Sequence, residues 1–325
     1  MPISSFPNGF TNGVTIRGLP IQNAYPGQVW WVNNSTILAP GGVAGSDQGP
    51  GTYQRPFQTL EGALSNGKLT SFAGRGDIVM VMPNHAETIS NATLMQLACA
   101  GVLIFGLGSG SSRPTFTLGT ATSSTINIQA ANMGFINCLF VANFAAVAAC
   151  FTLTTAKNFY LGNCEFRDSS SALNFVNIVK TDTTSNDADG LYIENCNFYG
   201  LGATSNTCLV NALGSNDKWT LKNNYVAHAA TTAGGFMQTA SGKNITNLLC
   251  DNNKGNFVGA TTASMAVLIL AGGTSNTGVI SNNYVQSLCD TTPVMATASS
   301  GWKYLNNYKT ANADKSGYLL PAVDS

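Results

Sequence analysis

Charged residues are scarce in this chain. Its 325 residues include only 15 Lys+Arg and 15 Asp+Glu, which is 9% of the chain, and the formal net charge is zero. The usual share in soluble domains is roughly 25%. Binding to nucleic acid or to an anionic membrane through bulk charge is therefore excluded, because both require a basic surplus. Disorder is also excluded, since 44% hydrophobic residues can fill a core.

Three further signals are missing. Residues 1–7 have neither the basic nor the apolar region of a secretory signal. No stretch reaches the roughly 18 uninterrupted apolar residues that a membrane span requires. The eight cysteines are too dilute for a disulfide scaffold, and none forms a CxxC pair of the kind that binds zinc. We expect no metal and no cofactor.

An internal repeat organises the chain from about residue 133. Each copy is an apolar-alternating segment, an Asn, then Cys or Asn, and in most copies an apolar residue two positions later. The leading asparagines, 24 to 32 residues apart, are Asn137, Asn163, Asn195, Asn223, Asn252, Asn282 and Asn306. The following position holds Cys138, Cys164, Cys196, Asn224, Asn253, Asn283 and Asn307.

Repeats of this length without helical periodicity predict an all-β solenoid of parallel coils. Asn tolerates the left-handed backbone that a tight turn between strands requires. We expect the residue after it to point inward and to stack into one ladder along the axis, thiol in three coils and amide in four. The position after that should point outward, as at Leu139, Glu165, Asn197, Tyr225, Lys254, Tyr284 and Tyr308.

The chain divides into three parts. Residues 1–44 are rich in Pro, Gly and Asn and predict an extended arm that is ordered by docking on the rod or on a neighbour. Residues 45–311 form the solenoid, which begins with a turn, a short amphipathic helix over 56–64 and a first strand over 76–83. The helix should cover the open end of the solenoid. Residues 312–325 form a C-terminal tail.

Three features of the chain indicate a family. These are the motifs of residues 45–64 (Gly-Ser-Asp, Pro-Gly-Thr and Pro-Phe-Gln-Thr-Leu-Glu-Gly-Ala-Leu), the strand start Gly76-Asp77-Ile78 and the Asn-[Cys/Asn] turns. In these features the chain resembles the right-handed parallel β-helix proteins of the pectin-lyase-like superfamily. Residues 13–20 and 30–34 also look like a group of tailed-phage β-helix proteins associated with virion structure. The resemblance covers roughly residues 45 to 310. It implies the fold, whose members include polysaccharide lyases and hydrolases, phage tailspikes and capsid decoration proteins.

The candidate catalytic residues are few. Asp182, Asp187 and Asp189 lie in one loop and could gather a hard cation, although a turn in which Asp caps its own backbone explains them better. Glu165 and Glu194 lie on opposite sides of the turn and make a poor catalytic pair. His85 and His228 have no neighbouring triad partner. Buried free thiols explain the cysteines better than a disulfide among Cys138, Cys164 and Cys196.

We expect an aromatic outer face at Tyr225, Tyr284 and Tyr308, which either binds protein or sugar or is simply composed of good strand residues. Ile16, Arg17, Trp30 and Trp31 in the arm are further partner-binding candidates.

The resemblance and the weak acidic inventory predict a protein that is not an enzyme. We expect a phage capsid decoration or cement protein, a homotrimer made in the host cytoplasm and bound to the virion exterior. Its partners are the major capsid protein and copies of itself, with no nucleic acid and no membrane. The alternative is a tailspike or tail-fibre protein that binds, and in one version depolymerises, host surface polysaccharide.

Overall fold

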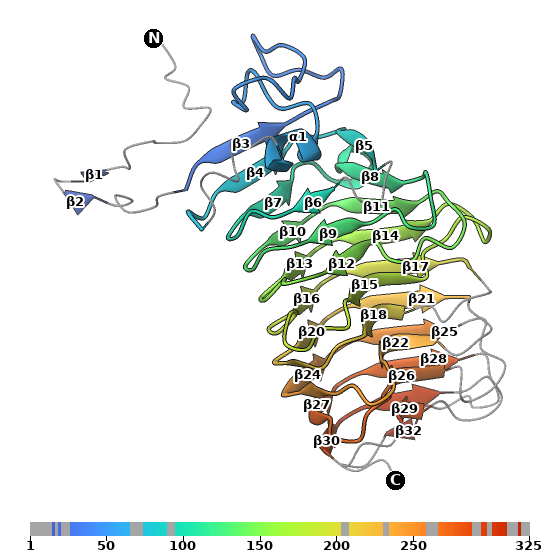
Figure 1. Ribbon diagram of the computed structural model, residues 1–325. Coiled ribbons are helices and arrows are strands. Elements are labelled where there is room, and N and C mark those ends of the chain that lie inside the picture. The colour runs from blue at the N-terminus through green and yellow to red at the C-terminus, as the bar shows by residue number, and fades with distance from the viewer. Residues whose placement is uncertain are drawn as a thin grey trace.

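A computed structural model describes residues 15–16, 19–20, 27–65, 74–89, 95–202, 208–229, 234–257, 266–287, 294–297, 301–310 and 318–319. These residues form a parallel β-helix. Figure 1 shows its coils stacked from β3 and α1 at one end to β30 and β32 at the other. No helix within the described ranges is long and apolar enough to cross a membrane. The predicted all-β solenoid is confirmed.

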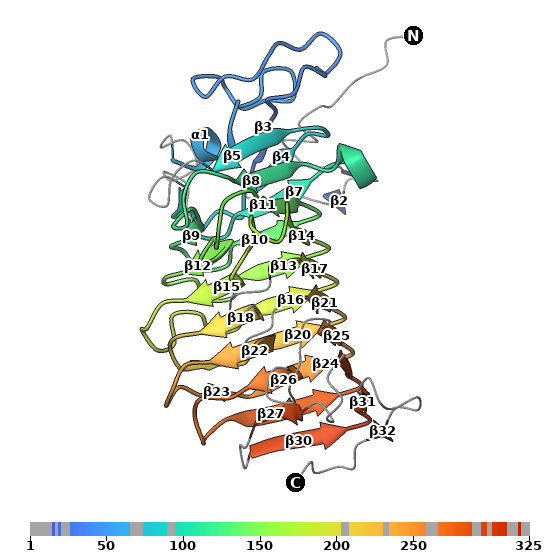
Figure 2. The ribbon, with the colours of Figure 1, turned by 90° about the vertical axis from the view of Figure 1, so that its right-hand side faces the viewer.

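The strands form three sheets of ten, ten and eight strands, to each of which a complete coil contributes one strand, and Figure 2 shows them from the side. Sheet one contains β3 (Val29–Val32), β4 (Ile78–Val81), β7 (Leu103–Gly106), β10 (Gly134–Ile136), β13 (Tyr160–Gly162), β16 (Tyr192–Glu194), β20 (Thr220–Lys222), β24 (Leu248–Asp251), β27 (Thr277–Ser281) and β30 (Gly301–Leu305). Sheet two contains β5 (Ala86–Ile89), β8 (Thr115–Leu118), β11 (Leu139–Ala142), β14 (Glu165–Asp168), β17 (Asn197–Gly200), β21 (Tyr225–His228), β25 (Lys254–Phe257), β28 (Tyr284–Ser287), β31 (Tyr308–Thr310) and β32 (Tyr318–Leu319). The last strand of sheet two, β32, pairs antiparallel with β31. Sheet three contains β6 (Gln96–Leu97), β9 (Ile126–Ile128), β12 (Phe151–Leu153), β15 (Asn177–Thr181), β18 (Cys208–Ala212), β22 (Gly234–Thr239), β26 (Ala266–Leu270) and β29 (Val294–Ala296).

The remaining elements lie outside these sheets. The pair β1 (Thr15–Ile16) and β2 (Leu19–Pro20) is antiparallel, and β19 (Asn216–Asp217) pairs in parallel with β23 (Ile245–Thr246). A 3₁₀ turn covers Gly110–Ser112. The helix α1 (Leu60–Ser65) buries Leu60, Ala63 and Leu64 in the main core, as expected of a helix that covers the first coil.

The repeated Asn builds the turn between sheet one and sheet two. All seven leading asparagines have positive φ, between 51° and 57°, as the left-handed region requires. The residue that follows each of them is buried and faces the interior of the coil. The turn has the same two-residue length in the seven coils from β10 to β31, and the strands on both sides of it keep one register along this part of the rod.

The inner ladder changes its chemistry along the axis. In the later coils, Asn253 Oδ1 accepts hydrogen bonds from the backbone N–H and the side-chain amide of Asn224, both at 3.0 Å. Asn283 and Asn307 repeat this arrangement in the next two coils. Each amide also donates to a backbone carbonyl of the preceding coil, at 2.6 to 2.9 Å. Every ladder asparagine is therefore satisfied while fully buried.

Aromatic stacking replaces hydrogen bonding in the earlier coils. Phe116, Phe140 and Phe166 occupy equivalent inward positions of sheet two, and their stacked rings lie 5.5 and 5.3 Å apart. The thiols of Cys138, Cys164 and Cys196 fill the ladder position of these coils as free, buried cysteines. No disulfide joins them.

Replacing Asn253 with Ala should lower the free energy of unfolding by about 2–4 kcal/mol, because the buried donors of Asn224 and the carbonyl of Leu221 lose their partner. Urea unfolding followed by circular dichroism measures this change. The matched control is Asn256→Ala in the same strand region, where the side chain points outward and the expected change is within about 0.5 kcal/mol. Equal effects of the two substitutions would contradict a stabilising ladder.

Candidate functional site

The outer faces of the three sheets differ in chemistry. On sheet three, successive coils present Asn127, Thr152, Lys180, Asn211 and Gln238 at equivalent outward positions. None of the described strands of this sheet contains Asp or Glu. Its face therefore offers amides, a hydroxyl and one ammonium group.

Sheet two carries the predicted tyrosines. Tyr225, Lys254, Tyr284 and Tyr308 follow one another in register at its outer surface, and the exposed fractions of Tyr284 and Tyr308 are 37% and 45%. Tyr199 lies beside Tyr225, with the two ring centres 5.7 Å apart. The structure thus brings the three predicted tyrosines onto one face and adds a fourth.

Sheet one has an apolar outer face at its N-terminal coils. Its two outward columns, which we call the apolar face, contain Val29, Trp31, Ile78, Met80, Leu103, Phe105 and Ile136. All of them are partly exposed. The adjacent inward residues Val32, Val79, Val81 and Ile104 are fully buried, so these strands are apolar on both sides.

The two tryptophans of the expected arm lie on opposite sides of β3. Trp30 packs on the core and its indole Nε1 donates to Asp77 Oδ2 at 2.8 Å. Trp31 belongs to the apolar face, where its ring and that of Tyr53 meet edge to face with their centres 4.8 Å apart. Ile16 lies in β1, whereas Arg17 lies outside the described residues. The described part of the expected arm is thus attached to the rod through β3.

Asp77 fixes β3 to the first coil. Its carboxylate accepts hydrogen bonds from the backbone N–H of Gln28 at 2.7 Å and from Trp30, and it forms an ion pair with Arg75 at 2.6 Å. Burial raises the pKa of this carboxyl, but the bonds from Arg75, Gln28 and Trp30 outweigh burial and hold the pKa below its usual range. The charged form of Asp77 therefore stabilises the position of the apolar face.

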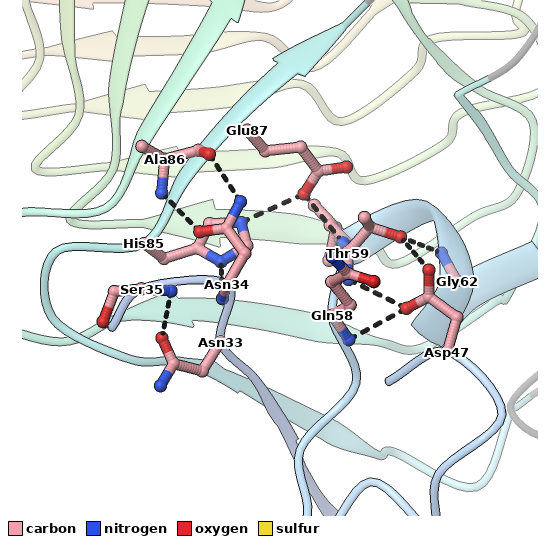
Figure 3. A network of polar contacts seen from close by, with 11 residues as sticks. Asn33, Asn34, Ser35, Asp47, Gln58, Thr59, Gly62, His85, Ala86 and Glu87 are labelled. Atoms are coloured by element: carbon pink, nitrogen blue, oxygen red, sulfur yellow. Dashed lines mark hydrogen bonds and ion pairs between the residues drawn. The ribbon is translucent and has the colours of Figure 1, made fainter. Parts of the chain in front are cut away.

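A second polar network holds the chain that leaves β3. His85 lies between Asn34 and Glu87: its Nδ1 accepts from the backbone N–H of Asn34 at 3.1 Å, and its Nε2 faces Glu87 Oε2 at 3.0 Å (Figure 3). Glu87 also accepts from the backbone N–H of Leu60, at the start of α1. Asp47 accepts from the hydroxyl of Thr59. The network connects four chain segments, around Asn34, Asp47, Thr59 and His85, and gives His85 a structural role.

The other catalytic candidates are separated in space. Glu165 lies on sheet two between Arg113 and Arg167, whereas Glu194 lies on sheet one and accepts from the hydroxyl groups of Tyr160 and Tyr192. His228 is buried against Phe257, and burial lowers its pKa to about 4. These residues do not assemble into one site.

Two carboxylates of the acidic loop accept backbone hydrogen bonds, one from within the loop and one from β19. Asp182 accepts from the backbone N–H of Thr184 at 3.1 Å, and Asp189 accepts from that of Asp217 at 2.8 Å. Within the described parts of the chain, no group of three or more His, Cys, Asp or Glu side chains is arranged to hold a metal ion.

Sequence reasoning missed the apolar face. The signal was present in the continuous apolar runs Val29–Val32, Ile78–Val81 and Leu103–Phe105, which lack the alternation of a strand with one wet side. Of these runs, only the one within residues 76–83 was predicted as a strand, and Val29–Val32 was assigned to the arm.

Comparisons with known proteins support the fold. No protein-family model matches the sequence, and no curated protein matches it significantly. Among solved structures, the pectin methylesterase from Aspergillus niger in its deglycosylated form matches with a TM-score of 0.51 and 14% identity, over 90% of this chain and 94% of that one. A penultimately deglycosylated form of the same enzyme gives a TM-score of 0.50 at 14% identity, with the same coverage. A rhamnogalacturonan lyase matches with a TM-score of 0.45 and 12% identity, over 89% of this chain and 75% of that one.

Two outcomes follow. The predicted right-handed parallel β-helix fold is confirmed. The expectation that the protein is not an enzyme is wrong, because the structures that share its fold are enzymes and so suggest enzymatic activity. We inferred that absence from a short supply of carboxylates. At 14% identity the shared fold transfers no reaction and no residue role.

Replacing Asp77 with Asn should lower the free energy of unfolding by about 3 kcal/mol at pH 7, because a buried ion pair loses its acid. Since the folded pKa lies below the unfolded value, the stabilisation is present above the unfolded pKa and is lost as the pH falls through the folded one. The difference between variant and wild type should therefore shrink below about pH 4. Unfolding at a series of pH values tests this, with Asp187→Asn as the control; a difference independent of pH would contradict it.

Proposed function

We propose that this protein is a structural component of a phage particle that decorates the capsid exterior as a homotrimer, with the apolar face buried between subunits. The observation that carries the proposal is the apolar face itself. Patches of this kind, with seven apolar side chains in two adjoining columns, commonly mark interfaces with other proteins.

The rest of the surface agrees with a role in an assembly. The net charge is zero, so copies of the chain do not repel one another. The ion pair at Asp77 and the network around His85 hold the N-terminal coils in one geometry, which reduces the entropy lost on association. The resemblance of residues 13–20 and 30–34 to phage virion proteins supports the same location, since it spans β3.

The double substitution Met80→Glu and Phe105→Glu should convert the trimer to a monomer, because it would place two carboxylates from each of the three subunits in the interface without partners. Sedimentation velocity measures the oligomeric state, and circular dichroism checks that the rod is folded. The control is Thr88→Glu with Thr117→Glu, which adds the same charges to the same coils on sheet two. A wild-type monomer, or a trimer that survives the Met80/Phe105 change, would count against the proposal.

We propose further that residues 1–26 anchor the protein to the particle. Their deletion should then abolish binding and leave the rod folded, because β3 and everything after it remain. The full chain and the truncated chain are incubated with particles that lack the protein, and bound material is measured after co-sedimentation. Cryo-electron microscopy of decorated particles then locates the rod over the shell or at the tail. Equal binding of both chains would refute anchoring through the N-terminal residues, and density confined to the tail would refute capsid decoration.

A further inference from the structure

Four tyrosines form a continuous strip over the C-terminal coils of sheet two. We call Tyr199, Tyr225, Lys254, Tyr284 and Tyr308 the tyrosine platform. Its strands β17, β21, β25, β28 and β31 are consecutive neighbours in the sheet, and β17, β21, β25 and β28 follow one another along one side of the rod in Figure 1. The exposed fraction of Tyr199 is 41%, similar to that of Tyr284 and Tyr308.

Other outward tyrosines stabilise the rod itself through hydrogen bonds of their hydroxyl groups. On sheet one, the hydroxyl groups of Tyr160 and Tyr192 donate to Glu194, at 2.7 and 3.3 Å. The platform tyrosines have no such acceptor among the described residues that surround them. Their hydroxyl groups therefore stabilise no neighbouring coil, and their rings and hydroxyls face outward.

The outward positions of the platform strands are polar and hold no Asp or Glu, and the adjoining strand β14 places Arg167, which is paired with Glu165, beside Tyr199. Asn197, Asn256 and Gln286 occupy the outward positions next to it. Across the described outward positions of these five strands there is no Asp or Glu, and the charge nearest the middle of the platform is the exposed Lys254. The surface combines aromatic rings, amide groups and one cation.

The platform also has a fixed period. Adjacent coils are ~4.8 Å apart, so Tyr284 and Tyr308 are separated by one step and Tyr225 and Tyr284 by two, with Lys254 between them. A ligand that uses all of these groups must itself be extended and repetitive, with flat apolar faces for the rings and hydroxyl groups for the amides.

We infer that the tyrosine platform binds an acidic polysaccharide chain that runs along the rod axis. Pyranose rings stack on the tyrosines through their C–H faces, the amides of Asn256 and Gln286 bind sugar hydroxyl groups, and a sugar carboxylate pairs with Lys254. The platform lies on sheet two, away from the apolar face of sheet one, so this inference does not rest on the proposed assembly.

Charge argues against a second copy of this chain as the occupant. Two platforms that face each other would bring together two surfaces with a lysine on each and no carboxylate on either. Nothing would then compensate the burial of Lys254. An acidic ligand supplies the missing charge.

Affinity electrophoresis tests the inference. The full-length protein is run through gels that contain alginate, hyaluronan or polygalacturonate, and through gels that contain uncharged dextran. We expect slower migration in at least one acidic polymer and none in dextran. Tyr284→Ala with Tyr308→Ala should weaken binding about tenfold, since two stacking contacts are lost. Tyr284→Phe with Tyr308→Phe, the matched control, keeps the rings and should bind within about threefold of wild type.

Lys254→Gln should remove the preference for acidic over neutral polymer and the dependence of binding on salt, while the rod stays folded. No retardation in any acidic polymer would overturn the inference, as would equal binding by the Ala double variant. A change of oligomeric state in the Ala double variant, measured by sedimentation, would show instead that the platform contacts protein. Neither result bears on the Met80/Phe105 test, because those residues lie on a different sheet.

Discussion

The structure depends on one constraint: every coil must meet the next in the same register. Parallel strands exchange hydrogen bonds only with their neighbours above and below, so the strands on either side of a turn must keep their register even where the turn is longer, as it is between β7 and β8. The left-handed asparagines keep the turn between sheets one and two constant, and the residue after each of them links adjacent coils from the inside. Both the apolar face and the tyrosine platform exist because this register repeats side chains at one position.

The sequence was most informative where it repeats. The Asn-[Cys/Asn] pairs allowed the coils, the inward ladder and the outward column from Leu139 to Tyr308 to be predicted, because each copy restates the same turn. The helix α1 could also be predicted, from the spacing of its apolar residues. These features depend on local geometry, which composition and spacing report directly.

Other features could not be read in this way. Strand alternation predicts that the adjacent residues Trp30 and Trp31 face opposite sides of a strand. It does not predict that Trp30 binds Asp77, which is 47 residues away and outside any repeat. The network of His85, Asn34 and Glu87 could not be predicted either, because it joins segments that only the tertiary fold brings together. Whether the protein has enzymatic activity could not be deduced from few carboxylates, since a reaction needs only a small number of groups brought together by the fold.

The ladder has one more consequence. Each coil contacts only the coils before and after it, and the amides of Asn224, Asn253, Asn283 and Asn307 all point the same way along the axis. A rod built in this manner can lengthen or shorten by a whole coil without disturbing its ends. Gain of one coil between β13 and β17 would move the tyrosine platform ~4.8 Å farther from the apolar face and leave both surfaces unchanged. The number of coils therefore determines the distance between two surfaces of one molecule.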